Sequence, residues 1–380
     1  MVEFTIQEIV NAVGGKLIQG NSDLRVRGVS TDSRRIQPEE LFIALKGERF
    51  DGHRFIEAVA QLGAAAVVVM EPVAAPAGVA VIQVTDTLVA LGAIARAHRR
   101  RFNIPTIGIT GSNGKTTTKD LIAAVLEQAC RVIKTEQNFN NEIGLPLTLF
   151  KITETTEATV VEMGMRGLGQ IRQLAEIAEP TIGVVTNVGL THLELLKSQE
   201  NIAKAKAELV EALDQNGVAI LNGDDPYVRA MQSLNRGKTV LYGIDTDGLD
   251  YRATGINSTV SGTEFNVETP DGTLAIKLPL PGRHNILNAL AAVAVGKTIG
   301  LSDTVIQAGL MAPEMTGKRL HILEHDGYRV IDDTYNASPT SVRAALDVLA
   351  GLQSVKRSIA VLADMLELGP DAARLHRDLG

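Results

Sequence analysis

Short apolar runs alternate with segments that are apolar on one helical face along most of this 380-residue chain. Between residues 86 and 311, the runs are short enough for buried strands and helical segments separate most of them, which is typical of a doubly wound parallel sheet. The five runs that we predict as strands are 106–110, 158–163, 182–186, 218–221 and 240–242. Because ligands of such sheets bind at the carboxyl ends of the strands, we expect functional residues there.

Two changes of pattern complete this central region. After residue 250 apolar and polar residues alternate up to a Pro-Asp-Gly turn at 270–272, which predicts an antiparallel flap. A helix rich in Ala, Leu and Val is predicted over 285–298 and ends before Gly300.

The segments on either side predict two more α/β domains, so we expect domains at 1–85, 86–311 and 312–380. The first shows a helix and four strand-like runs, at 5–13, 25–29, 41–44, 64–70 and 80–84. The third shows one βαβ turn of a Rossmann-like sheet, with elements at 328–332, 341–349 and 358–362. One such turn is too small to bury a core of its own, so we expect this domain to be truncated.

The apolar run at 106–110 leads into a glycine-rich loop and then an amphipathic helix. The loop residues are Gly111, Ser112, Asn113, Gly114, Lys115, Thr116 and Thr117. Glycines let backbone N–H groups surround an anion, and the helix N-terminus adds partial positive charge. Lys115 would reach the β- and γ-phosphates of a nucleotide, and Thr116 would ligate Mg²⁺. The spacing is a variant of the usual P-loop pattern, and a plain glycine turn with a surface lysine is the alternative.

Two further strand ends carry side chains that could complete a metal site. Glu162 lies at the end of the 158–163 run, where a carboxylate would join Thr116 around Mg²⁺. His192 follows the next run and could face the same crevice, although a histidine in a loop can equally be a surface residue without a role.

One predicted helix, over 200–213, places a lysine on its apolar face. Lys206 lies in the middle of that face, whereas Lys204 points to the opposite side. A lysine on a buried stripe either extends its ammonium group to solvent or is used chemically. Lys206 is therefore a candidate functional residue.

Composition excludes several classes of protein. The net charge is −7 and no basic face is evident, which argues against nucleic acid as a partner. A single cysteine, Cys130, excludes an internal disulfide and fits a reducing cytoplasm, where we expect the chain to act. The longest apolar run, around 62–70, is far too short for a membrane span, and no signal peptide is visible.

Taken together, four stretches resemble the Mur ligases of bacterial cell-wall synthesis: 110–117, Glu162-Met-Gly164, 187–194 and 282–288. Four more resemble the family member that adds D-alanyl-D-alanine to UDP-N-acetylmuramoyl-tripeptide: 138–146, 203–207, 332–339 and 364–369. The resemblance covers essentially the whole chain.

The resemblance implies a monomeric ligase with the three-domain Mur architecture, whose central domain is a P-loop ATPase. The first domain would hold the UDP-linked peptide, the second ATP and two Mg²⁺ ions, and the third would close over ATP and the incoming amine. ATP would phosphorylate the terminal carboxylate of UDP-N-acetylmuramoyl-tripeptide, and the amine of D-Ala-D-Ala would attack the acyl phosphate.

The resemblance also assigns roles residue by residue. The catalytic residues would be Lys115, Glu162, His192 and Lys206, and the metal ligands Thr116, Glu162, His192 and Lys206, with Lys206 carried as a carbamate. Besides the glycine loop, ATP would contact Asn285, Asn288, Arg319, Asp333 and Tyr335. The UDP-peptide would contact Ser30, Thr31, Asp32, Ser33, Arg34, Lys46, Asn140 and Asn141. Without the resemblance, the hydroxyl- and arginine-rich turn at 30–35 is better interpreted as a solvated loop than as a diphosphate site.

The chain departs from the family pattern at three points. Ser338 replaces an asparagine and Ala363 a glycine, and relatives continue beyond residue 380. We therefore expect nucleotide and UDP-peptide binding but poor ligation, and an inactive ligand-binding form remains an alternative. Another amino-acid-adding Mur ligase, or a folylpolyglutamate synthetase, would share the chemistry but not the 333–337 stretch. A GTPase is disfavoured because no Asn-Lys-x-Asp motif occurs.

Overall fold

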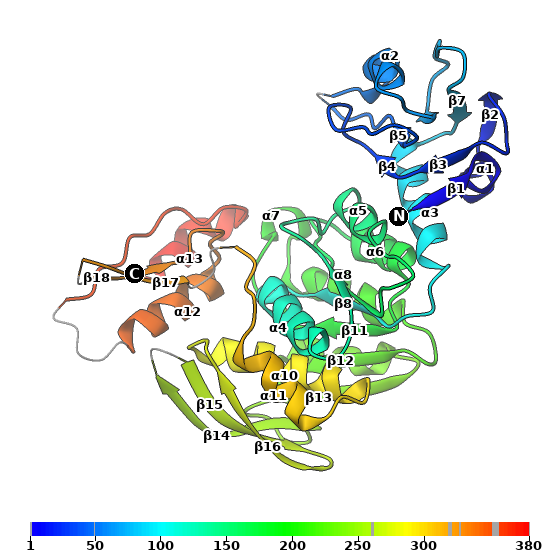
Figure 1. Ribbon diagram of the computed structural model, residues 1–380. Coiled ribbons are helices and arrows are strands. Elements are labelled where there is room, and N and C mark those ends of the chain that lie inside the picture. The colour runs from blue at the N-terminus through cyan, green and yellow to red at the C-terminus, as the bar shows by residue number, and fades with distance from the viewer. Residues whose placement is uncertain are drawn as a thin grey trace. The chain divides into compact units, whose positions relative to one another are not determined.

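The structure is a computed structural model that describes residues 2–48, 50–259, 262–317, 321–326, 328–351 and 357–379. It divides into two compact units, which are considered separately below (Figure 1). The first comprises Met1–Ile104, Asn138–Thr156 and Glu176–Glu179. The second comprises Pro105–Gln137, Glu157–Ala175 and Pro180–Gly380. Within the described residues, no helix is both long and apolar enough to cross a bilayer.

The first unit is a small α/β fold. Its strands are β1 (Glu3–Thr5), β2 (Lys16–Gln19), β3 (Arg25–Arg27), β4 (Val29–Ser30), β5 (Leu41–Ile43), β6 (Ala66–Val69) and β7 (Ala80–Gln83). Its helices are α1 (Ile6–Val13), η1 (Gly52–Phe55), α2 (Ile56–Gln61), α3 (Thr87–Arg99) and α5 (Gly144–Leu149). Strands β4 to β7 are parallel neighbours in the order β2-β7-β6-β5-β4, and β2 runs antiparallel to β7. The predicted helix and the predicted strands at 41–44, 64–70 and 80–84 are confirmed. The run at 25–29 is divided into β3, which pairs with β1, and β4, which belongs to the larger sheet.

Local chemistry explains where α1 begins and ends. The Thr5 hydroxyl accepts from the Glu8 backbone N–H while the Glu8 carboxylate accepts from the Thr5 backbone N–H, which satisfies donors that a helix start leaves open. Gly14 ends the helix in the left-handed conformation, with φ of 60°, which glycine adopts without steric cost.

The second unit is built on a nine-stranded sheet. Its strands are β8 (Thr106–Thr110), β9 (Val132–Lys134), β10 (Ala158–Glu162), β11 (Ile182–Val185), β12 (Val218–Asn222), β13 (Lys238–Gly243), β14 (Tyr251–Thr259), β15 (Gly262–Thr269) and β16 (Gly272–Leu278). Their order is β16-β15-β14-β13-β12-β11-β8-β10-β9. Strands β8 to β14 are parallel, and β14, β15 and β16 are antiparallel to one another in turn. The predicted doubly wound sheet and antiparallel flap are confirmed.

Helices cover this sheet and bury its central strands. They are α4 (Lys115–Glu127), α6 (Gln170–Ala178, which has residues in both units), α7 (Leu193–Leu196), α8 (Gln199–Glu211), α9 (Pro226–Ala230), η2 (Met231–Leu234), α10 (Arg283–Thr298) and α11 (Asp303–Met311). Every residue of β8, β10 and β11 is buried, which explains their continuous apolar character. Helix α4 packs against α10 and α11, so the helix that follows the glycine loop lies in the core.

The C-terminal part of this unit differs from the prediction at one strand. Its elements are β17 (His321–His325), β18 (Tyr328–Asp332), α12 (Pro339–Ala350), η3 (Gly369–Asp371) and α13 (Ala372–Arg377). The predicted strand at 328–332 and helix at 341–349 are confirmed, but β18 pairs in a hairpin with β17. Residues 358–362 form no strand, and Val361 is 92% exposed. Residues 358–362 have the apolar pattern of a strand, but they form none because no described strand pairs with them.

Candidate functional site

Strand register brings three strand ends to one edge of the sheet. Strand β8 lies between β10 and β11, and all three are parallel. Glu162 pairs with Ile109, and Val185 with Thr110, so the strands end at nearly the same level. The glycine loop after β8, the carboxylate that ends β10 and the loop after β11 therefore meet.

The glycine loop has a shape that only glycine permits at two positions. Gly111 has φ of 151°, and a Cβ there would lie 1.8 Å from the Thr186 hydroxyl oxygen. Gly114 has φ of 81°, and its Cβ would lie 2.6 Å from Asn288 Oδ1. Because both neighbours are held by other hydrogen bonds, a side chain at either position would deform the loop.

The loop after β11 holds the glycine loop in place. The Asn113 backbone N–H donates to Asn187 Oδ1 at 2.9 Å, and Asn187 Nδ2 donates to the Asn113 carbonyl at 3.0 Å. The Thr186 hydroxyl donates to the same carbonyl at 2.7 Å. Ser112 and Gly189 bond to each other through the serine hydroxyl, at 2.8 and 3.2 Å. The loop is therefore preformed by protein groups.

The predicted partners Thr116 and Glu162 are in contact. The Thr116 hydroxyl donates to Glu162 Oε2 at 2.8 Å, and both side chains are buried. The Glu162 backbone N–H donates to the Thr135 hydroxyl at 3.0 Å, which fixes the end of β10. Lys115 Nζ folds over the loop and donates to the carbonyls of Gly111 at 2.9 Å and Ser112 at 3.3 Å. A hydroxyl, a carboxylate and an ammonium group thus converge at the start of α4.

Two asparagines of α10 border the same loop. The Thr118 hydroxyl donates to Asn288 Oδ1 at 3.1 Å, and Asn288 Nδ2 donates to Asn285 Oδ1 at 3.2 Å. Asn285 Nδ2 donates to the Pro281 carbonyl at 2.8 Å, and both asparagines are buried. Burial lowers the pKa of the adjacent His284 to about 4, so its ring is neutral near pH 7.

Lys206 is the most unusual ionisable group of the site. The side chain is 2% exposed on α8, whereas Lys204 is exposed, as the helical phase predicts. Burial lowers the pKa of Lys206 well below its usual value, and the charge of Lys115 lowers it further. No described residue forms a hydrogen bond or ion pair with its ammonium group. A buried lysine in this state is favoured as the neutral amine.

His192 is close to the two lysines but pairs with a residue that sequence reasoning did not single out. Its Nδ1 lies 2.5 Å from Glu367 Oε2. Burial lowers the pKa of His192, Glu367 opposes this, and the charges of Lys206 and Lys115 lower it further. Both His192 and Glu367 adopt positive φ, of 58° and 61°, which non-glycine residues rarely do. That His192 and Glu162 share one metal ion stays a prediction.

The predicted C-terminal residues are placed in part. Asp333 and Tyr335 lie in the turn between β18 and α12, and Tyr335 is half-exposed. Arg319 lies outside the described residues. Ser338, noted only as a departure from the family pattern, caps α12 and donates from its hydroxyl to Asn113 Oδ1 at 3.0 Å. Its hydroxyl therefore contacts the glycine loop directly.

The predicted UDP-peptide residues lie in the first unit, where the largest group forms an exposed turn. Arg34 Nε and Nη2 each lie 2.8 Å from an oxygen of Asp32, and these bonds lower the pKa of Asp32 to about 2. Ser30, at the end of β4, bonds with the Asp32 backbone, and the turn continues through Thr31 and Ser33.

The other UDP-peptide candidates have partners of their own. Lys46 follows β5, which pairs with β4, and its ammonium group lies 2.6 Å from Glu71. Asn141 Oδ1 accepts from the Gly144 N–H at the start of α5, next to Asn140. No described contact joins the 30–34 turn to Lys46 or to Asn141.

The donor set suits phosphate and Mg²⁺. The loop contains two glycines at which a Cβ would clash, Gly111 and Gly114, and the Thr116 hydroxyl already bonds to the Glu162 carboxylate. Within the described ranges, no three His, Cys, Asp or Glu side chains gather as a metal cluster.

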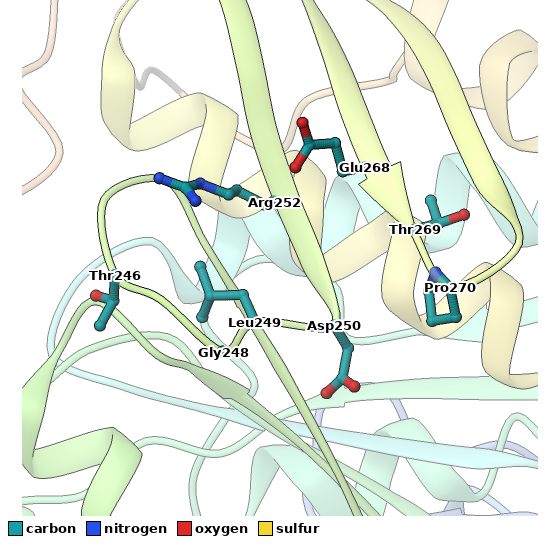
Figure 2. Close-up of a pocket in the computed structure, with 8 residues that line it drawn as sticks. All are labelled: Thr246, Gly248, Leu249, Asp250, Arg252, Glu268, Thr269 and Pro270. Atoms are coloured by element: carbon teal, nitrogen blue, oxygen red, sulfur yellow. The ribbon is translucent and has the colours of Figure 1, made fainter.

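A cavity of about 310 Å³ lies elsewhere in the second unit. It is lined by Thr246, Gly248, Leu249, Asp250, Arg252, Glu268, Thr269 and Pro270, on and beside β14 and β15 (Figure 2). None of the predicted site residues lines it. Arg252 is used within the fold, because it donates to the Ile244 carbonyl at 3.2 Å and pairs with Asp247 at 3.5 Å.

The sheet, the preformed loop and the buried lysine define a phosphate-binding α/β protein, and three stretches match domains of one family. Residues 25–137 match the catalytic domain of the Mur ligase family, residues 109–296 the Mur ligase middle domain, and residues 318–380 the glutamate ligase domain of Mur ligases. The chain belongs to the Mur ligase family, which confirms the resemblance seen in its motifs.

The similar proteins described next are all named as one particular member of this family. The UDP-N-acetylmuramoyl-tripeptide–D-alanyl-D-alanine ligase of Bacillus subtilis is 42% identical, covering 100% of this chain and 82% of the relative. Among solved structures, MurF from Acinetobacter baumannii aligns with a TM-score of 0.94 and 32% identity, covering 100% of this chain and 83% of that one. MurF ligase from Thermotoga maritima in complex with ADP aligns with a TM-score of 0.85 and 30% identity, covering 93% and 81%.

Proposed function

We propose that the chain is an ATP-dependent ligase of peptidoglycan synthesis that joins D-alanyl-D-alanine to UDP-N-acetylmuramoyl-tripeptide. The observation that carries the proposal is the preformed glycine loop, with Lys115 folded over it and the Thr116–Glu162 pair at its edge. The names of the relatives support the choice of substrates. The ADP in the Thermotoga structure supports ATP as the phosphate donor.

In this proposal the loop N–H groups and Lys115 hold the phosphates of ATP. The peptide carboxylate attacks the γ-phosphorus, ADP leaves, and an acyl phosphate forms. The amine of D-Ala-D-Ala then attacks the acyl carbon, and the tetrahedral intermediate collapses to the amide and inorganic phosphate. Lys115 offsets the negative charge on the transferring phosphoryl group, which costs little reorganisation because the loop is already formed.

Two Mg²⁺ ions fit the residues at the edge of the loop. Thr116, Glu162, His192 and Lys206 would hold them, and when bound they supply positive charge that offsets the phosphates. An unmodified Lys206 ammonium would repel such ions. Its burial and the charge of Lys115 favour the neutral amine, which can take up CO₂ and become an anionic carbamate.

The remaining roles follow the family pattern. Asn285 and Asn288, which border the loop, would contact the adenine, and Asp333, Tyr335 and Arg319 would contact the nucleotide from the C-terminal side. The UDP-peptide residues would be Ser30, Thr31, Asp32, Ser33, Arg34, Lys46, Asn140 and Asn141. The domains predicted at 1–85, 86–311 and 312–380 remain part of the proposal, as does a monomeric enzyme. A cytoplasmic location fits the use of ATP and the single cysteine.

The test is phosphate release by the purified chain with ATP and Mg²⁺. We expect release only when UDP-N-acetylmuramoyl-tripeptide and D-Ala-D-Ala are both present, and peptides with lysine or diaminopimelate in third position should both be offered. Release with a single amino acid in place of the dipeptide would point to another Mur ligase, and release with a folate and glutamate to a folylpolyglutamate synthetase. Nucleotide binding without release under any condition would identify a ligand-binding, inactive form.

A further inference from the structure

A buried ion pair on α4 has no part in the chemistry proposed above. Lys119 Nζ lies 3.2 Å from Asp120 Oδ1, and both side chains are fully buried. Desolvating two charges is costly, and a buried pair of this kind gives little net stability compared with apolar residues of similar size. Its contacts are therefore a better guide to its role than its contribution to stability.

The Lys119–Asp120 pair is hydrogen-bonded to Thr316. This residue belongs to the connector, which we define as residues 312–317 between α11 and β17. The Thr316 backbone N–H donates to Asp120 Oδ2 at 2.7 Å, and its hydroxyl donates to Asp120 Oδ1 at 2.9 Å. Lys119 Nζ donates to the same hydroxyl oxygen at 3.2 Å. Thr316 thus makes three polar contacts with two adjacent residues, and these fix both its backbone and its side chain.

The other contact of Lys119 leads to the candidate metal ligands. Lys119 Nζ donates to the Thr135 carbonyl at 2.8 Å, and the Thr135 hydroxyl accepts from the Glu162 N–H at 3.0 Å. Glu162 in turn accepts from the Thr116 hydroxyl, one helical turn before Lys119 on α4. A continuous chain of hydrogen bonds therefore joins the connector to the end of β10 and the start of α4.

We propose that Lys119 and Asp120 anchor the connector, and that Thr316 is a positioning residue for ligation. By holding the residue from which the chain continues into the C-terminal part, the pair sets where Asp333 and Tyr335 stand relative to the glycine loop. The expected effect of Thr316 on ligation rests on the proposed function. The anchor itself rests only on the contacts of Thr316, Lys119, Asp120 and Thr135.

The decisive comparison is Thr316→Val against Thr316→Ser. Valine keeps the shape and the backbone N–H but removes the hydroxyl that both charged residues contact. We expect Thr316→Val to lower kcat for ligation by about 10- to 100-fold, because small misplacements of catalytic groups are costly. Affinity for Mg²⁺-ATP should stay within about twofold of the parent protein, since the loop is not altered. Thr316→Ser should restore kcat.

Thr304→Val is the matched control. Thr304 lies exposed on α11, and its hydroxyl lies 3.0 Å from the Ser302 hydroxyl, away from the connector and the glycine loop in sequence. The Thr304→Val substitution should change neither kcat nor nucleotide affinity. A simple loss of stability would lower kcat in proportion to the folded fraction and would reduce nucleotide binding with it. Full kcat in Thr316→Val, or a serine variant as slow as the valine variant, would overturn the proposal.

A second measurement does not depend on ligation. Backbone amide exchange of the peptide containing Thr316 should slow when Mg²⁺ and a non-hydrolysable ATP analogue bind, because the chain through Glu162 and Thr135 then becomes more rigid. The slowing should persist in Thr304→Val and disappear in Thr316→Val. Binding of the analogue with no change at Thr316 would overturn the anchor, whereas failure to ligate D-Ala-D-Ala with the slowing intact would overturn only the proposed function.

Discussion

Two turns of this protein are candidates for holding phosphate groups, and they are built in opposite ways. The glycine loop after β8 is surrounded by buried polar groups, and its backbone is fixed by Thr186, Asn187 and Gly189. The turn at 30–34 after β4 is exposed: its arginine side chain is 84% exposed and is held by a carboxylate from the same turn.

The contrast separates two ways of preparing an anion site. In the glycine loop, neighbouring loops already hold the backbone N–H groups in position. The free-energy cost of orienting these donors is therefore met during folding and not when a ligand binds. In the 30–34 turn, Asp32 pairs with the guanidinium of Arg34 in water, where such pairs contribute little to stability. A diphosphate would have to compete with this carboxylate. We therefore expect changes in the loop to affect catalysis, and changes in the turn to affect mainly substrate affinity.

The largest effect is expected from Lys115→Ala. The Lys115 ammonium group donates to the carbonyls of Gly111 and Ser112 in the loop, so its role is polar and the fold should persist without it. Removing the positive charge that Lys115 places next to the phosphoryl group should raise the activation free energy by about 3–4 kcal/mol, which lowers kcat about 100- to 1,000-fold. Affinity for the UDP-peptide should be unchanged when measured by calorimetry. Full-rate turnover by a folded Lys115→Ala protein would remove the basis for the ATP site.

The next effect distinguishes Lys206 from Lys204. Lys206→Ala should lower kcat by about 100-fold, because it removes a charge-stabilising ligand from the site. Burial and the charge of Lys115 lower the pKa of Lys206, which favours the neutral amine that carbamate formation needs. A small carboxylate such as formate should partly restore activity to Lys206→Ala, and Lys204→Ala should be nearly silent. Loss of activity in the Lys204 variant alone would show that the carbamate lies elsewhere.

Sequence patterns identify the strands and the residues that carry local signals. Strand β8 was predicted at its observed bounds, and Lys206 was recognised because helical spacing alone places it on a buried face. Residues that act through long-range contacts give no such signal. Glu367 is 175 residues from His192 in the chain, and Lys119 and Asp120 are indistinguishable by pattern from ordinary charges on a helix surface.

The strand predicted at 358–362 shows that a local signal can also predict an element that does not form. The β-branched and apolar residues of that segment have the composition of a strand, but a strand forms only where another strand can pair with it. Pairing is a property of the whole sheet and cannot be deduced from five residues. Likewise, Asn187 fixes the glycine loop through contacts that span 74 positions in the chain.

A smaller effect is expected from Arg34→Ala. A charge-assisted hydrogen bond to a diphosphate contributes about 1.5–3 kcal/mol, so KM for the UDP-peptide should rise about tenfold or more. The kcat value should change little, because Arg34 lies in a different part of the fold from the glycine loop and does not contact the reacting groups. Arg35→Ala is a matched control, since Arg35 is equally exposed and lies 4.0 Å from the same carboxylate. Equal losses in both variants would mean that general positive charge, and not the Asp32–Arg34 arrangement, binds the substrate.

The smallest effect should come from Asp32→Asn. Hydrogen bonds from Arg34 lower the pKa of Asp32 from 3.8 to about 2. Because the folded-state pKa lies below the unfolded value, the unfolded chain binds more protons between these limits. The contribution of Asp32 to stability is therefore present above about pH 3.8 and is lost as the pH falls toward 2. The variant should lower Tm by no more than about 2 °C at pH 7, and the difference should shrink below pH 3.8.

Asp120→Asn is the counterpart of this substitution in the second unit. It changes the same atoms, but in a pair that is fully buried and leaves the Lys119 ammonium without its carboxylate. Removing one partner of a buried pair destabilises far more than removing one partner of an exposed pair, so Tm should fall by several times more than in Asp32→Asn. If calorimetry found equal shifts for the two variants, the turn at 30–34 would be as firmly built as the core of the second unit. The contrast between a site formed by folding and one that competes with its own carboxylate would then be wrong.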